Sequence, residues 1–158
     1  MIVWGGSHRS GGRYNPATDS WTPTSTEDPN TMRSNHTAVW TGTEMVVWGG
    51  DDIDGPSQVG RIYTPATRSW RSTSNSNLGE RYAHTAVWTG TEMIVWGGQS
   101  GNSVFYTGGR FNPTTNTWAP VATNNAPDGR AWPEAVWTGT EMIVWGGRQN
   151  GGGLLTDG

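Results

Sequence analysis

The chain lacks two residue types on which much enzyme chemistry depends. It has no cysteine, which excludes disulfides, thiol nucleophiles and thiolate metal sites and leaves the redox compartment undecided. It also has no lysine, so all 10 positively charged side chains are arginine. A Walker A phosphate loop, a Schiff-base lysine and a pyridoxal-phosphate site are therefore excluded.

Long apolar runs and concentrated positive charge are also missing. No window approaches about 18 apolar residues, and the opening stretch 1–6 is too short for the apolar region of a signal peptide. The isoelectric point is near 5.5, and the arginines are scattered singly, so no basic stripe tracks phosphates. We expect neither a membrane nor a nucleic acid as partner.

Tryptophan and glycine are abundant. Leu, Ile, Val and Phe number only 21 of 158 residues, a proportion that alone would suggest disorder. The net charge is only -3, however, and 11 tryptophans provide large surfaces that can be buried. We therefore expect one folded domain over residues 1–158.

A short string, Val-Trp-Gly-Gly, occurs four times along the chain. Its Trp recurs with spacings of 44, 48 and 49 residues. Three copies end the longer unit Ala-Val-Trp-Thr-Gly-Thr-Glu-Met-(Val/Ile)-Val-Trp-Gly-Gly, and an aromatic residue and a Trp seven positions apart follow a double glycine three times. These pairs are Tyr14 with Trp21, Tyr63 with Trp70, and Phe111 with Trp118. A period of 40 to 50 residues indicates stacked or radial repeats.

Each repeat predicts four short strands. Residues 37–40 are β-branched and aromatic, and Thr-Gly-Thr-Glu predicts a tight hairpin into residues 45–48, which are apolar on both faces. The third strand ends at an Asn-Pro turn, and the fourth is limited by Pro23 as an outer edge would be. No segment has sustained helical periodicity. We predict an all-β fold of four-stranded antiparallel blades.

This pattern resembles the kelch repeat of β-propellers, and the resemblance covers nearly the whole chain. It implies blades arranged radially around a central channel. It implies no single activity, because kelch propellers include protein-binding modules, sugar-binding or sugar-isomerising proteins and one class of copper oxidases. The copper oxidase site needs a cysteine joined to a tyrosine, which this chain cannot supply. We expect no cofactor.

The strand count predicts that one chain forms about three blades. Residues 1–32 give strands two to four of a blade, 33–80 and 81–129 give complete blades, and 130–158 give strands one and two and a tail. Closed propellers need about four to eight blades, so we expect a homodimer that closes a six-bladed ring. Strand two of the shared blade is then present twice, and either residues 2–6 or residues 142–147 are displaced. A fragment of a longer propeller would show the same surplus.

The candidate ligand-binding face is formed by the loops after strands two and four. These loops vary in length and content, and variable loops on a rigid scaffold usually carry binding specificity. Arg33, Arg81 and Arg130 lie there in register, each seven residues before the Trp of strand one. They could form a ring that binds a carboxylate, or each could contact a backbone carbonyl between blades.

Three further residues complete the candidate ligand-binding set. Trp132 lies outside the periodic Trp positions, so it is either a platform for a sugar or protein partner or a filler at an irregular junction. His36 and His84 occupy the same position in two repeats, where the third has Pro133. No catalytic motif accompanies them, which favours strand-start residues hydrogen-bonded to an adjacent blade.

Two acidic patterns support neither catalysis nor metal binding. Glu44, Glu92 and Glu141 lie in the repeated hairpin loop, where turn chemistry explains them. The loop 51–55 fails the EF-hand calcium template, because positions one and twelve would be glycine and arginine. We assign no catalytic residue and no metal ligand.

We interpret the chain as a non-enzymatic β-propeller module for a protein or carbohydrate ligand. The alternatives are a sugar-processing propeller enzyme such as a mutarotase, and a self-assembling propeller fragment without a ligand. All three interpretations use the same repeats, so the sequence alone does not separate them.

Overall fold

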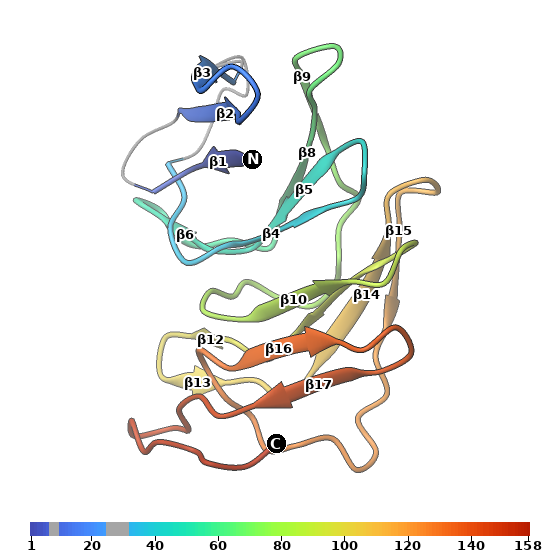
Figure 1. Cartoon of the computed structure of the whole chain (residues 1–158). Helices are drawn as coiled ribbons and strands as arrows, with labels where there is room; N and C mark the ends of the chain where they lie inside the picture. The colour runs from blue at the N-terminus through green and yellow to red at the C-terminus, as the bar shows by residue number, and fades with distance from the viewer. Residues whose placement is uncertain (7–9, 25–31) are drawn as a thin grey trace.

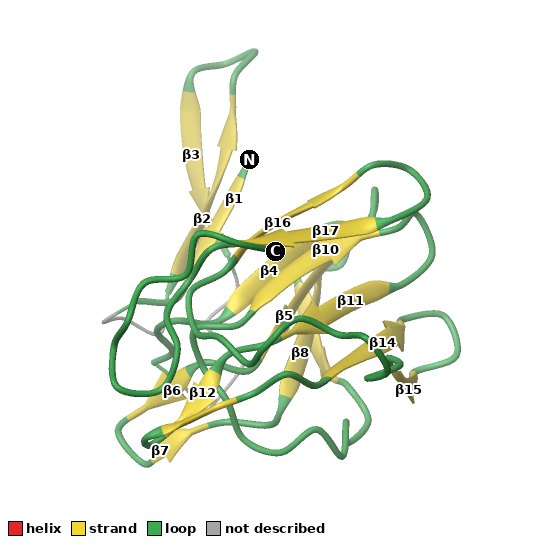
Figure 2. Cartoon of the chain, turned by 90° about the horizontal axis from the view of Figure 1, so that it is seen from below, coloured by secondary structure: helices red, strands yellow, loops and turns green. Residues whose placement is uncertain are grey.

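Antiparallel sheets without any helix make up the part of the chain described by the computed structural model, residues 1–6, 10–24 and 32–158 (Figure 2). The prediction of an all-β fold is thereby confirmed. No helix in these residues is long and apolar enough to cross a membrane.

Two complete four-stranded sheets form the centre of the chain. Their strand order is the order of the sequence, and both have the same register, since Val46 lies opposite Ile62 as Ile94 lies opposite Arg110. The predicted four-stranded antiparallel blade is confirmed. Sheet II consists of β4 (Thr37–Trp40), β5 (Met45–Trp48), β8 (Gly60–Thr64) and β9 (Ser69–Ser72), and sheet III of β10 (Thr85–Trp88), β11 (Met93–Trp96), β14 (Gly108–Asn112) and β15 (Thr117–Pro120).

Incomplete sheets lie at both ends of the chain (Figure 1). Sheet I has no strand equivalent to β4 among the described residues, and sheet IV has none equivalent to β14 and β15. Two small hairpins extend from sheets II and III. Sheet I consists of β1 (Ile2–Trp4), β2 (Gly11–Asn15) and β3 (Ser20–Pro23), sheet IV of β16 (Glu134–Trp137) and β17 (Met142–Trp145), and the hairpins of β6 (Asp51–Asp52) with β7 (Gly55–Pro56) and β12 (Gln99–Ser100) with β13 (Ser103–Val104).

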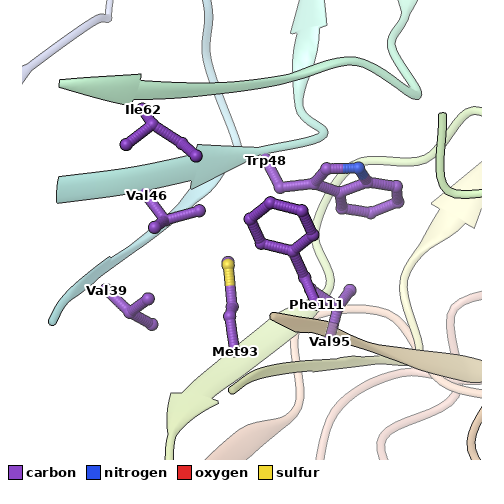
Figure 3. Packing of buried hydrophobic residues seen from close by; sticks show 7 residues of the cluster. All are labelled: Val39, Val46, Trp48, Ile62, Met93, Val95 and Phe111. Atoms are coloured by element: carbon purple, nitrogen blue, oxygen red, sulfur yellow. The ribbon is translucent and has the colours of Figure 1, made fainter. Parts of the chain in front are cut away.

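The hydrophobic core lies between the sheets. The first strands of sheets II, III and IV lie side by side, β4 against β10 and β10 against β16. Between sheets II and III, apolar side chains of both sheets pack into one cluster (Figure 3). Its members are Val39, Val46, Trp48, Ile62, Met93, Val95 and Phe111. β5 is apolar on both faces because one face packs in this cluster with sheet III and the other packs in a second cluster with sheet I.

The repeated double glycine joins neighbouring sheets. Gly49 and Gly50 have φ angles of 64° and 91°. A Cβ atom at Gly50 would lie 2.5 Å from the carbonyl oxygen of Ser34, so no side chain fits. The Gly50 N–H donates to the carbonyl of Arg81 in the next sheet at 2.9 Å. Equivalent bonds at 2.8 Å join Gly6 to Arg33 and Gly98 to Arg130.

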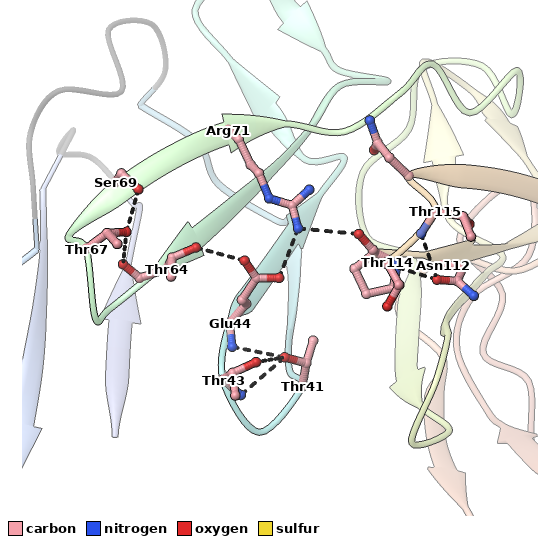
Figure 4. A network of polar contacts seen from close by, with 12 residues as sticks. Thr41, Thr43, Glu44, Thr64, Thr67, Ser69, Arg71, Asn112, Thr114 and Thr115 are labelled. Carbon is pink, nitrogen blue, oxygen red and sulfur yellow. Dashed lines mark hydrogen bonds and ion pairs between the residues drawn. The ribbon is translucent and has the colours of Figure 1, made fainter.

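The repeated Thr-Gly-Thr-Glu loops are held by their own side chains (Figure 4). The Thr41 hydroxyl accepts the N–H of Glu44 at 2.9 Å, and the Glu44 carboxylate accepts the Thr64 hydroxyl at 2.8 Å. Arg71 pairs with the same carboxylate at 2.9 Å and donates to the carbonyl of Pro113 in sheet III at 3.4 Å. These contacts give Glu44 a structural role.

Candidate ligand-binding face

The three arginines in register are buried, each about 1% exposed. Arg33 donates to the carbonyl of Val59 at 2.6 Å. Arg130 donates to the carbonyl of Gly146 at 3.1 Å and to that of Asp157 at 2.7 Å. Because the guanidinium groups are enclosed and donate to backbone oxygens, the structure favours the carbonyl-contact interpretation over a ring that binds a carboxylate.

Arg81 shows the arrangement in most detail. Its guanidinium donates to the carbonyls of Gly97 and Thr107, both at 3.0 Å, and to that of Leu78, and it lies 4.2 Å from the centre of the Phe105 ring. Burial lowers the pKa of Arg81 to about 10, which leaves it charged at neutral pH. The contact between sheets is made instead by its backbone carbonyl, which accepts the N–H of Gly50. The side chain thus joins strands of its own sheet, where we expected it to join neighbouring blades.

The two histidines lie at the contacts between sheets. His84 packs edge-on against Trp48 of the preceding sheet at 5.1 Å, and its Nε2 is 2.7 Å from the Thr37 hydroxyl of that sheet. His36 packs edge-on against Trp4 in the same way at 5.5 Å. Burial lowers the pKa of both, that of His84 to about 3 with the charge of Arg81 adding to the effect. Both are therefore neutral at pH 7.

Trp132 is placed differently from the other predicted residues. It has a φ of 52°, and its equivalents Asn35 and Ala83 have φ angles of 52° and 55°. The three are joined across sheets, since Ala83 N–H donates to the Asn35 carbonyl at 3.0 Å and Trp132 N–H to the Ala83 carbonyl at 2.7 Å. The backbone imposes this left-handed conformation, which is unusual for a bulky residue. The side chain is half-exposed, at 49%.

An open pocket of about 490 Å³ lies beside Trp132. The Arg148 guanidinium lies 6.0 Å from the centre of the indole ring, and Tyr82 packs edge-on against that ring at 6.4 Å. The polar lining comes from the β12–β13 hairpin and the C-terminal tail. Its side chains are Gln99, Asn102, Arg148, Gln149 and Asn150. The pocket therefore combines one aromatic face with amides and one guanidinium.

Sequence reasoning identified Trp132 but missed the other lining residues. Arg148 directly follows the double glycine, where the other repeats have Asp51 and Gln99, and this change of charge was a usable signal. Parts of the expected face, residues 7–9 and 25–31, lie outside the described residues. Within the described ranges, no group of three His, Asp or Glu side chains could hold a metal ion.

Comparison with known proteins identifies the family. The model of the KLHDC2/KLHL20/DRC7 Kelch-repeats domain matches residues 1–157. The chain belongs to the kelch-repeat family. The resemblance inferred from the double glycines and the aromatic-to-Trp interval is confirmed. No curated protein sequence matches the chain.

A solved structure supports the same fold for this kelch chain. The structure of YjhT superposes on this chain with a TM-score of 0.79 and 17% sequence identity, and the match covers 94% of the residues of this chain. An identity this low shows the fold alone. The kelch chain spans 56% of the length of YjhT, about half of that protein.

Proposed function

We propose that this kelch chain is a binding module for a carbohydrate, which stacks on Trp132. The observation that carries the proposal is an exposed indole held by a fixed backbone at the edge of a pocket lined by amides. A sugar ring presents C–H groups that pack on an aromatic face, and its hydroxyls both donate to and accept from amide side chains. An apolar face beside a few polar groups is the usual composition of a small-molecule site.

The lining residues favour binding over catalysis. General acid–base chemistry needs a group that exchanges a proton near the working pH, most often His, Asp or Glu. The described lining of this pocket includes no His, Asp or Glu side chain. The mutarotase alternative therefore has less support here than a binding role.

A glycan array with purified chain tests the proposal. Wild type should bind a defined set of sugars, and Trp132→Ala should reduce the affinity at least about tenfold with the melting temperature nearly unchanged. Tyr106→Ala is the matched control, because Tyr106 is also an exposed aromatic but does not line the pocket. No sugar bound by wild type would contradict the proposal. A loss of several kcal/mol of stability in Trp132→Ala would instead support the junction-filler interpretation.

We also propose that two copies of the chain form a six-bladed ring. Trp145 on β17 is 58% exposed, whereas its equivalent Trp48 is completely buried. Trp21 on β3 is 54% exposed, whereas its equivalents Trp70 and Trp118 are partly buried. Exposed apolar faces of this kind mark interaction surfaces. Light scattering should give twice the mass of 17.1 kDa at micromolar concentration. A dimer that binds no glycan would support the interpretation as a self-assembling unit.

A further inference from the structure

We infer that the ring closes by strand replacement, with β17 of one copy taking the place of β1 in the other. The shared blade then consists of β16 and β17 from one chain and β2 and β3 from its partner. This inference rests on the proposed pairing of two chains, and it specifies which of the two copies of strand two is displaced.

The two competing strands are identical in sequence. Residues 1–6 and residues 142–147 both read Met-Ile-Val-Trp-Gly-Gly. β1 pairs with β2 so that Ile2 lies opposite Arg13, in the register that places Ile94 opposite Arg110 in sheet III. β17 can therefore pair with the partner's β2 in the same register, which places Ile143 opposite the partner's Arg13.

The tryptophan contacts between sheets show where Trp145 fits. Trp4 packs against His36 at 5.5 Å and Trp70 at 5.1 Å. Trp48 makes the same two contacts with the next sheet. Trp145 has the equivalent position on β17, and no following sheet covers it in the described chain. After replacement it occupies the position of Trp4 against the partner's His36 and Trp70.

A groove beside β17 lies where the third and fourth strands of sheet IV would be. It has a volume of about 820 Å³, with Trp96 of β11 on one side and Val144 of β17 on the other. The segment 120–127 and Gly158 of the tail also line it. Sheet III has its third and fourth strands, β14 and β15, at the equivalent place beside β11. The partner's β2 and β3 fit this groove, and the exposed Trp21 then packs on Trp96 as Trp118 packs on Trp48.

The tail after β17 marks the start of that third strand. The Gly146 N–H donates to the carbonyl of Asp157 at 2.9 Å, as the Gly97 N–H donates to that of Thr107 at 3.2 Å. Gly158 thus has the position of Gly108, the first residue of β14. The partner's β2 begins with the equivalent glycine, Gly11, so residues 157–158 leave this position when that strand pairs with β17. The carbonyl of the partner's Ser10 then takes the place of the Asp157 carbonyl, as the Ser10 carbonyl accepts the Gly5 N–H within one chain.

The hairpin of β16 and β17 indicates that β1 is the strand displaced. Release of β1 frees residues 1–6, whose contacts β17 restores. Release of β17 would break its pairing of four residues with β16, against three between β1 and β2. It would also break the turn in which the Thr138 hydroxyl accepts the Glu141 N–H at 3.0 Å.

The replacement also extends the candidate ligand-binding face. The backbone carbonyls of Asn35 and Ala83 each accept an N–H from the next sheet. In the ring, the carbonyl of Trp132 accepts the N–H of the partner's Asn35 in the same way. The partner's loops then continue the face beside the Trp132 pocket.

Engineered disulfides test the inference, because the chain has no cysteine of its own. Ile143→Cys with Arg13→Cys should give a covalent dimer on oxidation, since residues paired across strands are close enough for a disulfide. Ile2→Cys with Arg13→Cys, which are paired in the single chain, should form little disulfide in the dimer. Val136→Cys with Ile2→Cys reports the opposite replacement and should not cross-link.

Light scattering on the same variants separates this inference from the proposed pairing. A monomer at all concentrations overturns both. A dimer that cross-links through positions 136 and 2, or that retains the 2–13 disulfide within one chain, overturns the strand replacement and leaves the pairing intact. Trp21→Ala should raise the dimer dissociation constant at least about tenfold, whereas Tyr106→Ala should leave it unchanged.

Discussion

Stability of the chain should depend on pH through His84. The pKa of His84 falls from its usual 6.5 to about 3, first because the ring is buried and then because Arg81 and His36 lie nearby. Since the unfolded chain binds the proton more readily, the contribution of His84 is fully present above pH 6.5. It is lost as the pH falls toward 3. The difference between pH 7 and pH 4.5 is on the order of 2 to 3 kcal/mol.

Urea unfolding followed by tryptophan fluorescence measures this dependence. His84→Gln keeps a polar side chain beside Thr37 without a group that titrates near neutral pH, so it should flatten the profile between pH 4.5 and 7 by about 2 kcal/mol. His36, whose pKa is also lowered by burial, accounts for a remaining slope of the same sign. If His84→Gln and wild type lose stability in parallel over this range, His84 is not held neutral by the contact between sheets, and the argument is refuted.

Two further substitutions test the joints of the repeat. Arg81→Met should lower the free energy of unfolding by about 3 kcal/mol in urea melts, because several buried carbonyls lose their donor; a change below about 1 kcal/mol would contradict this. Gly98→Ala should cost more than about 2 kcal/mol, since φ is 89° and a Cβ would lie 2.8 Å from the Tyr82 carbonyl oxygen. Gly101→Ala is its control at about 1 kcal/mol, because φ is 56° and the space is open; equal effects would refute the steric argument.

The repeated strands were predictable because their residues are required by local geometry. The double glycine recurs since both positions have positive φ and one lies against the backbone of the next sheet. The aromatic-to-Trp interval recurs since Tyr63 and Trp70 lie opposite each other on β8 and β9, as Phe111 and Trp118 do on β14 and β15. Spacing along the chain therefore predicted pairing across the sheet.

The partners of the buried arginines could not be predicted in the same way. Arg33 and Arg81 donate to backbone carbonyls, and every residue has such an acceptor. The sequence therefore predicted their register and left the acceptors open. The pocket beside Trp132 was hidden for a related reason, since its amides come from loops that do not repeat.

Residues 35, 83 and 132 show that one backbone position of the repeat accepts very different side chains. Their backbones have the same left-handed conformation and are joined by the same type of bond between sheets. Stability at this position depends on the backbone, so the side chain can change from Asn to Ala to Trp without altering the scaffold. Only Trp offers a large aromatic face to a ligand. If two chains form a ring, this one departure from the repeat occurs on both halves, and under the proposed carbohydrate function we expect a multivalent glycan to bind with higher avidity to the two Trp132 pockets than to either pocket alone.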